Sequence, residues 1–166
     1  MRFRLPAAAV AAFALLVFPA VAAAPKHITP RGVGKVKLHA THASLKAKGV
    51  VGRQRAGCNL SGPGARAAKL RAPLEGAVDL TRTKPRRVKS IIVTGGATAR
   101  GVGIGDRKAD IVAAYPKAKF DKSTRKVFGI TLVKIPKNGG GRLQMAIDVK
   151  THKVTTFGIP FIEFCE

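Results

Sequence analysis

A self-similarity at one fixed spacing constrains the fold of this chain more than any single motif does. The apolar residues keep the same phase near the start and near the end of two consecutive segments, with no insertion between them. The aligned pairs, all separated by the same interval (the repeat spacing), are Val36 with Val102, Leu38 with Ile104, Leu45 with Ile111, Val88 with Val154, Ile91 with Phe157 and Val93 with Ile159. A fixed period of this kind is typical of repeated structural units. It predicts two tandem units, residues 24–94 and 95–166. Few positions are identical, so a chance alignment of apolar residues is the alternative.

Residues 100–116 show how such a unit begins. Two apolar residues alternate with glycines, which is typical of a short strand that enters a turn. Asp106 stands where the N-cap of a helix belongs, because its carboxylate can accept hydrogen bonds from the free N–H groups of the first turn. Pro116 disfavours helical geometry at the residue before it, so we expect the helix to end there. Thr41 predicts a similar cap in the first unit.

The remaining patterns predict an antiparallel sheet. Residues 76–80 and 88–93 flank a basic turn and indicate a hairpin. Residues 143–149 alternate between apolar and polar side chains, which indicates a half-buried strand. Residues 154–161 form the last predicted strand, and Pro160 favours an edge or a bulge for it. The predicted fold class is α+β: one sheet-based domain in which each unit packs a short helix on antiparallel strands.

Residues 1–23 have the pattern of a secretory signal peptide. Arg2 and Arg4 precede an uninterrupted apolar run over residues 7–18, and a small-x-small site follows at 20–22. A retained membrane anchor is the alternative, but the run is short for a bilayer span. We therefore expect a mature protein that is secreted or extracytoplasmic, in the cell envelope, with no membrane span after cleavage. Loss of the two arginines lowers the formal charge from +23 to +21.

The chain has two cysteines, Cys58 and Cys165. In an exported protein an isolated pair predicts a disulfide, which here would join the first half to the extreme C-terminus. A redox or nucleophilic thiol is the alternative. Neither cysteine belongs to a C-x-x-C pair or has a histidine near it in sequence, which argues against that alternative.

The excess of basic residues is the sequence feature that bears most directly on function. Residues 25–74 hold eleven Lys and Arg and no acidic residue, and Glu75 is the first acid of the chain. Such a surface attracts polyanions in a salt-dependent way, although a purely solubilising role is the alternative. Few aromatic residues are available to stack bases, which argues against a specific nucleic-acid site. The candidate polyanion contacts are Lys35, Lys37, Lys46, Lys48, Arg53, Arg55, Lys84, Arg86 and Arg87.

No catalytic, cofactor or metal motif stands out. Residues 101–105 have the spacing G-x-G-x-G, which is not the G-x-G-x-x-G of a dinucleotide site, and Asp106 beside them would repel a phosphate. The four histidines are scattered as surface residues, and no Cys, Asp or Glu near them in sequence completes a metal-ligand set. No serine lies in a G-x-S-x-G elbow. We therefore expect a protein that is not an enzyme and uses no cofactor.

Residues 102–111, VGIGDRKADI, with Tyr115-Pro116 after them, resemble the opening of each unit in β-lactamase-inhibitor-protein-like tandem-repeat proteins. They are also similar to small secreted actinobacterial proteins of unknown function with the same unit. The resemblance implies a non-catalytic binding module that presents a sheet. In the first unit, residues 39–41 depart from the glycine and polar pair of that opening. The predicted disulfide joins the two halves, whereas the cysteines of that family lie within units, so no contact residues are transferred.

Together these patterns predict an exported, non-catalytic binding module whose sheet face opposite the helices meets a protein. The alternative is a basic cell-envelope protein that associates with polyanions such as wall polymers, anionic lipid head groups or nucleic acid. A hydrolase is the weakest of the three hypotheses. Salt separates the first two, because charge attraction fades as ionic strength rises.

Overall fold

The computed structural model describes residues 24–138 and 141–164. These residues form a mixed α and β fold that is mostly sheet, with short helices, as the sequence predicts. The first half contains β1 (Lys26–Thr29), β2 (Gly32–Val33), β3 (Val36–Lys37), α1 (His42–Ala47), β4 (Val51–Ala56), the 3-10 helix η1 (Asn59–Ser61), β5 (Arg66–Leu70), β6 (Glu75–Leu80) and β7 (Val88–Gly95). The second half contains β8 (Ala97–Thr98), α2 (Lys108–Ala114), β9 (Lys119–Asp121), α3 (Arg125–Phe128), β10 (Ile130–Asn138), β11 (Gly141–Asp148) and β12 (Val154–Ile159).

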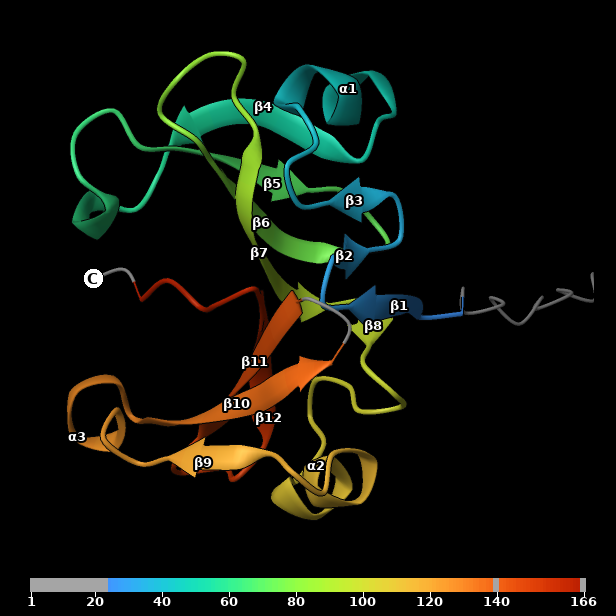
Figure 1. Cartoon of the computed structure of the whole chain (residues 1–166), viewed down its shortest axis with the longest axis vertical. Helices are drawn as coiled ribbons and strands as arrows, with labels where there is room; N and C mark the ends of the chain where they lie inside the picture. Colours follow the sequence, from blue (N-terminus) through green and yellow to red (C-terminus); the bar gives the residue numbers. More distant parts are fainter. Residues whose placement is uncertain (1–23, 139–140, 165–166) are drawn as a thin grey trace, which may run out of the picture.

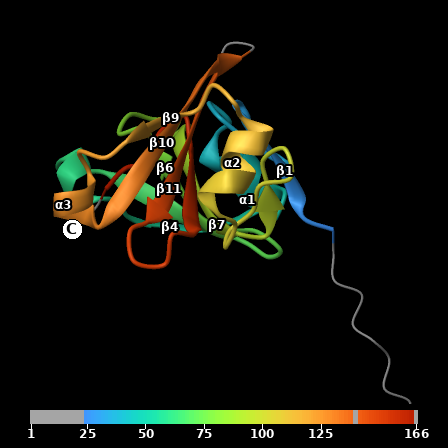
Figure 2. The ribbon, with the colours of Figure 1, turned by 90° about the horizontal axis from the view of Figure 1, so that it is seen from below.

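Two sheets organise the described residues. The larger sheet has eight antiparallel strands in the order β4-β5-β6-β7-β12-β11-β10-β9. The smaller has the order β3-β2-β1-β8, in which β1 and β8 pair in parallel. Figure 1 shows the small sheet, α1 and α2 on one side of the large sheet, and η1, α3 and residues 160–164 on the other. The view turned by 90° agrees for α2, β1 and α3 (Figure 2).

The core lies between the large sheet and the layer of helices and small sheet. Leu45 of α1 and Ile111 of α2 are both fully buried in it, and so are Phe157 and Met145 of the large sheet. α3 buries no residue, whereas α1 and α2, each of two turns or fewer, each bury one apolar residue. Such short helices are not stable alone in water, so packing against the sheet holds them in place.

The two halves meet at the centre of the large sheet, where β7 pairs with β12. Ile92 lies opposite Gly158, which stands one repeat spacing later in the chain. The neighbouring pairs are Ile91 with Ile159 and Val93 with Phe157. When each residue of the pair Ile91–Ile159 is replaced by its counterpart in the other half, the result is the pair Phe157–Val93. The register is therefore symmetric about the pair of Ile92 with Gly158.

The entries to α1 and α2 are held by the same backbone hydrogen bonds, at positions one repeat spacing apart. In the first half the His39 N–H donates to the Val88 carbonyl and the Val88 N–H donates to the Ala40 carbonyl, both at 2.9 Å. The corresponding bonds of the second half, both 2.8 Å, join Gly105 N to Val154 O and Val154 N to Asp106 O. His39 (φ 64°) and Gly105 (φ 93°) both have positive φ. The histidine therefore occupies a backbone conformation that favours glycine.

The predicted cap of α1 is confirmed, and that of α2 is wrong by one residue. The Thr41 hydroxyl accepts a hydrogen bond from the Ser44 N–H at 3.2 Å. In the second half Arg107 is the N-cap, and the Asp110 carboxylate accepts from its N–H at 2.8 Å. The Asp106 carboxylate accepts instead from the Gly103 N–H at 2.7 Å and closes the turn before the helix. The helix begins later because the backbone of Asp106 is still paired with the sheet.

The predicted hairpin and the alternating strand are confirmed as β6, β7 and β11. The expectation that Pro160 places the last strand at an edge or bulge is wrong. β12 lies in the middle of the large sheet, and the register shift in its pairing with β11 lies near Val154, at the other end of the strand. Pro160 follows Ile159, the last residue of β12, and so breaks no hydrogen bond of the ladder.

The predicted signal peptide, residues 1–23, lies outside the described residues. The helices in the described part of the chain are all too short or too polar to span a bilayer.

Candidate anion-binding surface

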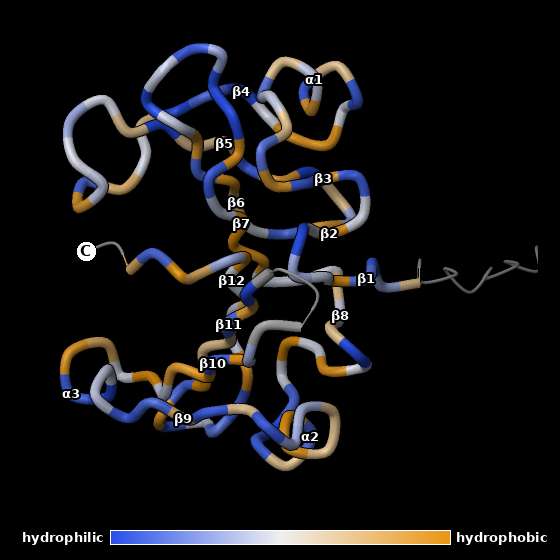
Figure 3. Tube along the Cα trace, viewed as in Figure 1, coloured by the Kyte–Doolittle hydropathy of each residue, from blue (hydrophilic) through white to orange (hydrophobic). Residues whose placement is uncertain are grey.

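The nine candidate polyanion contacts all lie in the first half of the chain and reach the surface. Eight of them are exposed, and Arg86 is half-buried. They lie on the β2–β3 hairpin, at the end of α1, on β4, and in the connection between β6 and β7. Figure 3 shows β4 and the β6–β7 connection as mostly hydrophilic. The fold thus gathers these cations at one end of the molecule.

The β6–β7 connection lies against the start of α1. Thr41 pairs with Arg87 across an isolated bridge, and the His42 N–H donates to the Arg86 carbonyl at 2.9 Å. Lys84 and Arg86 line an open hollow of about 560 Å³ together with His42 and Gln54. Two of the predicted cations therefore share one concave surface.

Arg55 of β4 lies on the opposite face of the strand. The Gln54 amide bonds to His42 on α1, so this side chain lies on the helix side of the sheet. Strand side chains alternate between faces, which places the neighbouring Arg55 on the face away from the helices. The exposed Arg53 lies where the pairing of β4 with β5 shifts register. Lys35 and Lys37, and Lys46 and Lys48, form separate pairs on the β2–β3 hairpin and at the end of α1. The cations thus surround the first half rather than forming one patch.

Two of the predicted contacts also hold backbone. The Arg86 guanidinium donates to the Thr81 carbonyl at 3.3 Å, and the Arg87 guanidinium donates to the His39 carbonyl at 3.0 Å. These bonds leave the positive charges in place, since a carbonyl carries no formal charge. They give both arginines a structural role that the sequence did not indicate.

The carboxylates are used mostly for local structure. Those that accept from nearby backbone N–H groups are Asp106 from Gly103, Asp110 from Arg107, Asp121 from Ser123, and Asp148 from Lys150 and Thr151. Hydrogen bonds from Lys134 and Ser123 hold the pKa of Asp121 well below its usual range. Hydrogen bonds from Thr151 likewise lower the pKa of Asp148. All four carboxylates are thus committed to turns and caps.

Two ion pairs occur among the described residues, Lys89 with Glu163 and Lys134 with Asp121. Neither includes any of the nine candidate contacts. In the part of the chain that the structure describes, these nine cations therefore form no ion pair with a carboxylate.

Residues 160–164, which follow β12, form a tail on the sheet face opposite the helices. The Ile162 N–H donates to the Gln144 side chain at 2.9 Å, and an added Cβ at Gly158 would meet Ile162 at 2.5 Å. The ring of Phe164 stacks on that of Phe128 of α3, with centroids 4.4 Å apart. The tail thus crosses the middle of the face that the sequence predicted to meet a protein.

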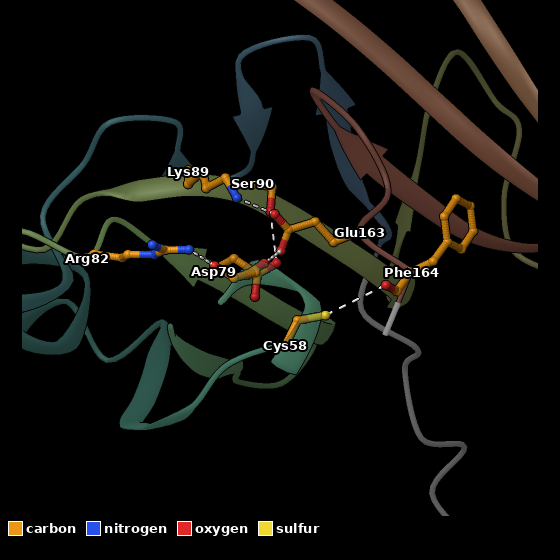
Figure 4. A network of polar contacts seen from close by, with 8 residues as sticks. Cys58, Asp79, Arg82, Lys89, Ser90, Glu163 and Phe164 are labelled. Carbon is orange, nitrogen blue, oxygen red and sulfur yellow. Dashed lines mark hydrogen bonds and ion pairs between the residues drawn. The ribbon is translucent and has the colours of Figure 1, made fainter. Parts of the chain in front are cut away.

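A polar network fastens this tail to the first half (Figure 4). Glu163 pairs with Lys89 of β7 and accepts from the Ser61 hydroxyl at 2.9 Å. The Arg82 guanidinium donates to the Ser61 carbonyl. Cys58 is buried, and its Sγ lies 3.7 Å from the Phe164 carbonyl oxygen. Cys165 lies outside the described residues, so the predicted disulfide between them stays a prediction.

The same network brings together two carboxyl groups that the sequence left apart. Asp79 accepts from the buried Ser90 hydroxyl at 2.8 Å and lies beside Glu163. Burial raises the pKa of Asp79; the bond from Ser90 opposes this effect and the charge of Glu163 adds to it. The carboxylates of Asp79 and Glu163 accept hydrogen bonds from Ser90 and Ser61, and Glu163 also pairs with Lys89. Because Glu163 belongs to the tail, this network indicates a structural role, which is to hold the tail on the sheet. No spacing in the sequence could have indicated this contact, because it joins β6 to the C-terminus.

The prediction that all histidines lie at the surface is wrong for His42, which is 7% exposed. One ring nitrogen, Nε2, bonds to the Gly52 carbonyl, and the other, Nδ1, to the Gln54 amide, both at 3.0 Å. Since the carbonyl only accepts, Nε2 carries the proton and Nδ1 accepts. No group of three or more potential metal ligands gathers among the described residues.

Compared with models of protein families, with curated proteins and with solved structures, the chain matches none of them.

Proposed function

We propose that this protein is an exported, non-catalytic protein that binds an anionic polymer of the cell envelope through the first half of its chain. The observation that supports this proposal most is the imbalance of charge at that end. The candidate cations are exposed or half-exposed there, and none of them takes part in the ion pairs of the described residues.

The physical basis of this binding is long-range electrostatic attraction, which does not require a fixed geometry of the polymer. Cations spread over both faces of the first half create a positive potential that draws a flexible polyanion from several directions. Binding releases counterions from the polymer, so affinity falls steeply as salt rises. No catalytic group is needed for this role.

The test is retention of the mature, oxidised protein on immobilised polyphosphate, eluted with a salt gradient. In one variant Arg53, Arg55 and Lys84 become Gln; in a matched control Lys122, Lys126 and Lys150 of the second half become Gln. All six side chains are exposed, and both variants lose three charges. We expect the first variant to elute at clearly lower salt than the control. Equal elution would show that net charge alone acts, and would contradict a binding surface in the first half.

A second candidate function is protein binding on the sheet face opposite the helices. Leu60 of η1 and Val127 of α3 are 66% and 70% exposed, and Phe128 of α3 is 38% exposed. Both segments lie on the same side of the large sheet as the tail (Figure 1). Exposed apolar side chains of this size favour contact with a protein. Capture from the organism's own envelope and secreted fraction at high salt, with Leu60→Ser and Val127→Ser as loss variants, tests this function.

We also propose that the chain consists of two tandem units, residues 24–94 and 95–166. The symmetric register of β7 and β12 supports this organisation, and so do the matching hydrogen bonds at the entries to α1 and α2. Further support comes from the isolated bridge of Thr41 with Arg87, which recurs between Arg107 and Lys153. On this proposal the nine candidate cations all belong to the first unit.

A further inference from the structure

A second cavity lies at the other end of the small sheet, away from the candidate anion-binding surface. It has a volume of about 560 Å³ and lies between β1, the end of α2, and the paired strands β10 and β11. The buried side chains of Ile28 and Leu143 line it, together with Ile135 and Tyr115. Its volume lies in the range of small-molecule sites, which are mostly apolar with a few polar groups.

The remaining polar side chains of this cavity favour an anion. Arg100, Lys117 and His27 are exposed at its border, and none of its lining residues is acidic. The Arg100 guanidinium lies 5.3 Å from the centroid of the Tyr115 ring. Stacking on the ring holds this charge beside the apolar wall, where an ionic contact is less screened than in open water.

Arg100 has a positive φ, a backbone conformation that an arginine rarely adopts. Arg100 (φ 50°) and Gly101 (φ 85°) form a two-residue turn, closed by Ala99 and Val102 through hydrogen bonds of 2.8 and 3.0 Å. Two successive positive φ angles favour Asn-Gly or Gly-Gly in such turns. The position one repeat spacing earlier is Gly34, which has the same φ of 50°. An arginine therefore stands where the matching turn has glycine, and strained positions of this kind concentrate at functional sites.

We propose that this cavity binds an amphipathic anion: a small ligand with an aliphatic part and one carboxylate or phosphate group. The aliphatic part packs against Ile28 and Leu143, and the anionic group pairs with Arg100 and Lys117. The inference is independent of the polyanion surface, because none of its residues belongs to that surface.

The first test is calorimetric titration of the mature, oxidised protein with octanoate, 1-octanol and acetate at low salt. Octanoate carries both features, whereas octanol lacks the charge and acetate lacks the chain. We expect octanoate to bind about tenfold more tightly than octanol, because a charge-assisted hydrogen bond contributes about that factor. Acetate should bind more weakly than octanoate because it lacks the methylene groups that the apolar wall would bury. Octyl phosphate in a fourth titration tells whether phosphate or carboxylate is preferred. Equal affinity for octanoate and octanol would overturn the proposal.

The decisive variant is Arg100→Gly, with the exposed Lys122→Gln as the control for loss of one charge. Glycine suits the backbone at this turn, so we expect the thermal midpoint of Arg100→Gly to stay the same or rise, while octanoate affinity falls about tenfold. The control should bind octanoate as the unmodified protein does. Unchanged affinity in Arg100→Gly would overturn the proposal. The variant of Arg53, Arg55 and Lys84 should bind octanoate normally, so failure of the polyanion proposal leaves this test unaffected.

Discussion

The turns that precede α1 and α2 have the same length and the same positive φ at their first residue, but their glycines stand at opposite positions, in Gly34-Lys35 and in Arg100-Gly101. Val33 and Val36 close the first turn with Gly34 at its positive φ, whereas Ala99 and Val102 close the second with Arg100 in that place. At the entries to the helices the glycine lies in the second half, and the first half has a larger residue at the matching position. His39 occupies a left-handed position in the first half, where the second half has glycine. The hydrogen bonds and buried apolar residues hold the backbone, so the exposed positions are free to differ.

We expect the largest loss of stability from substitutions in the central strands β7 and β12, where the two halves meet. Phe157 and Ile91 lie one repeat spacing apart, and both are fully buried. We expect Phe157→Ala to lower the free energy of unfolding by about 3–5 kcal/mol and Ile91→Ala by about 2–5 kcal/mol. Urea unfolding followed by circular dichroism measures both. Because the halves share one sheet, each variant should shift a single transition. Two separate transitions would contradict one cooperative domain.

The predicted disulfide between Cys58 and Cys165 should have the next largest effect, because it ties the tail of the second half to the first. The chain-entropy model gives about 4.7 kcal/mol for a loop of about 100 residues, and measured contributions are often smaller. Unfolding of the Cys58→Ser, Cys165→Ser double variant, compared with the oxidised protein, measures it. Thiol labelling of the folded, unreduced protein is the control. Two reactive thiols there would show that the bond does not form.

A smaller difference in the free energy of unfolding should distinguish substitutions at the entries to α1 and α2. An added Cβ at Gly105 meets no atom within 4 Å, so Gly105→Ala costs only the strain of its positive φ, about 1 kcal/mol. His39→Gly removes a strained residue and should change the free energy of unfolding by less than that, with the opposite sign. Thermal unfolding of both variants measures this difference. A destabilisation by His39→Gly equal to that of Gly105→Ala would show that the His39 side chain contributes contacts.

The smallest effect is a pH dependence of stability from Asp79. Its folded pKa is raised above the ordinary value of 3.8, so the folded state holds the proton more tightly than the unfolded state does. This contribution to stability is present below the unfolded pKa and is lost as pH rises through the folded pKa. We therefore expect Asp79→Asn to gain stability relative to the unmodified protein as pH rises over this interval.

Asp121→Asn serves as the comparison of opposite sign. The pKa of Asp121 is lowered, so its contribution is present above the unfolded pKa and is lost as pH falls. Urea unfolding between pH 3 and pH 7 measures both variants. Parallel pH profiles for the two variants would contradict the opposite shifts.

Local patterns in the sequence predicted much of the fold. The alternation of residues 143–149, the hairpin around the basic turn and the cap at Thr41 all appear in the structure. Each of these depends on neighbouring residues and on burial of one face. Pro160 misled the prediction because a proline indicates only that a ladder hydrogen bond is missing. It does not tell whether the strand before it is central.

The candidate sites were less accessible to sequence reasoning. Exposure of the nine cations followed from their chemistry, but their division between the two faces of the first half depended on Gln54 reaching His42. The cavity beside Arg100 combines β1 with strands that come much later in the chain. The signal that could have indicated it is an arginine at the position where the earlier turn has Gly34.

By itself the sequence determined the mixed fold class, the phase of the buried residues, and the basic character of the first half. These properties depend on local periodicity and composition, which are read directly from the chain. Only the tertiary structure decided that β7 and β12 lie together, that Glu163 of the tail pairs with Lys89, and that Arg100 stands at the border of an apolar cavity. These contacts join residues far apart in the chain. Their formation depends on how the whole core packs rather than on any neighbouring residues.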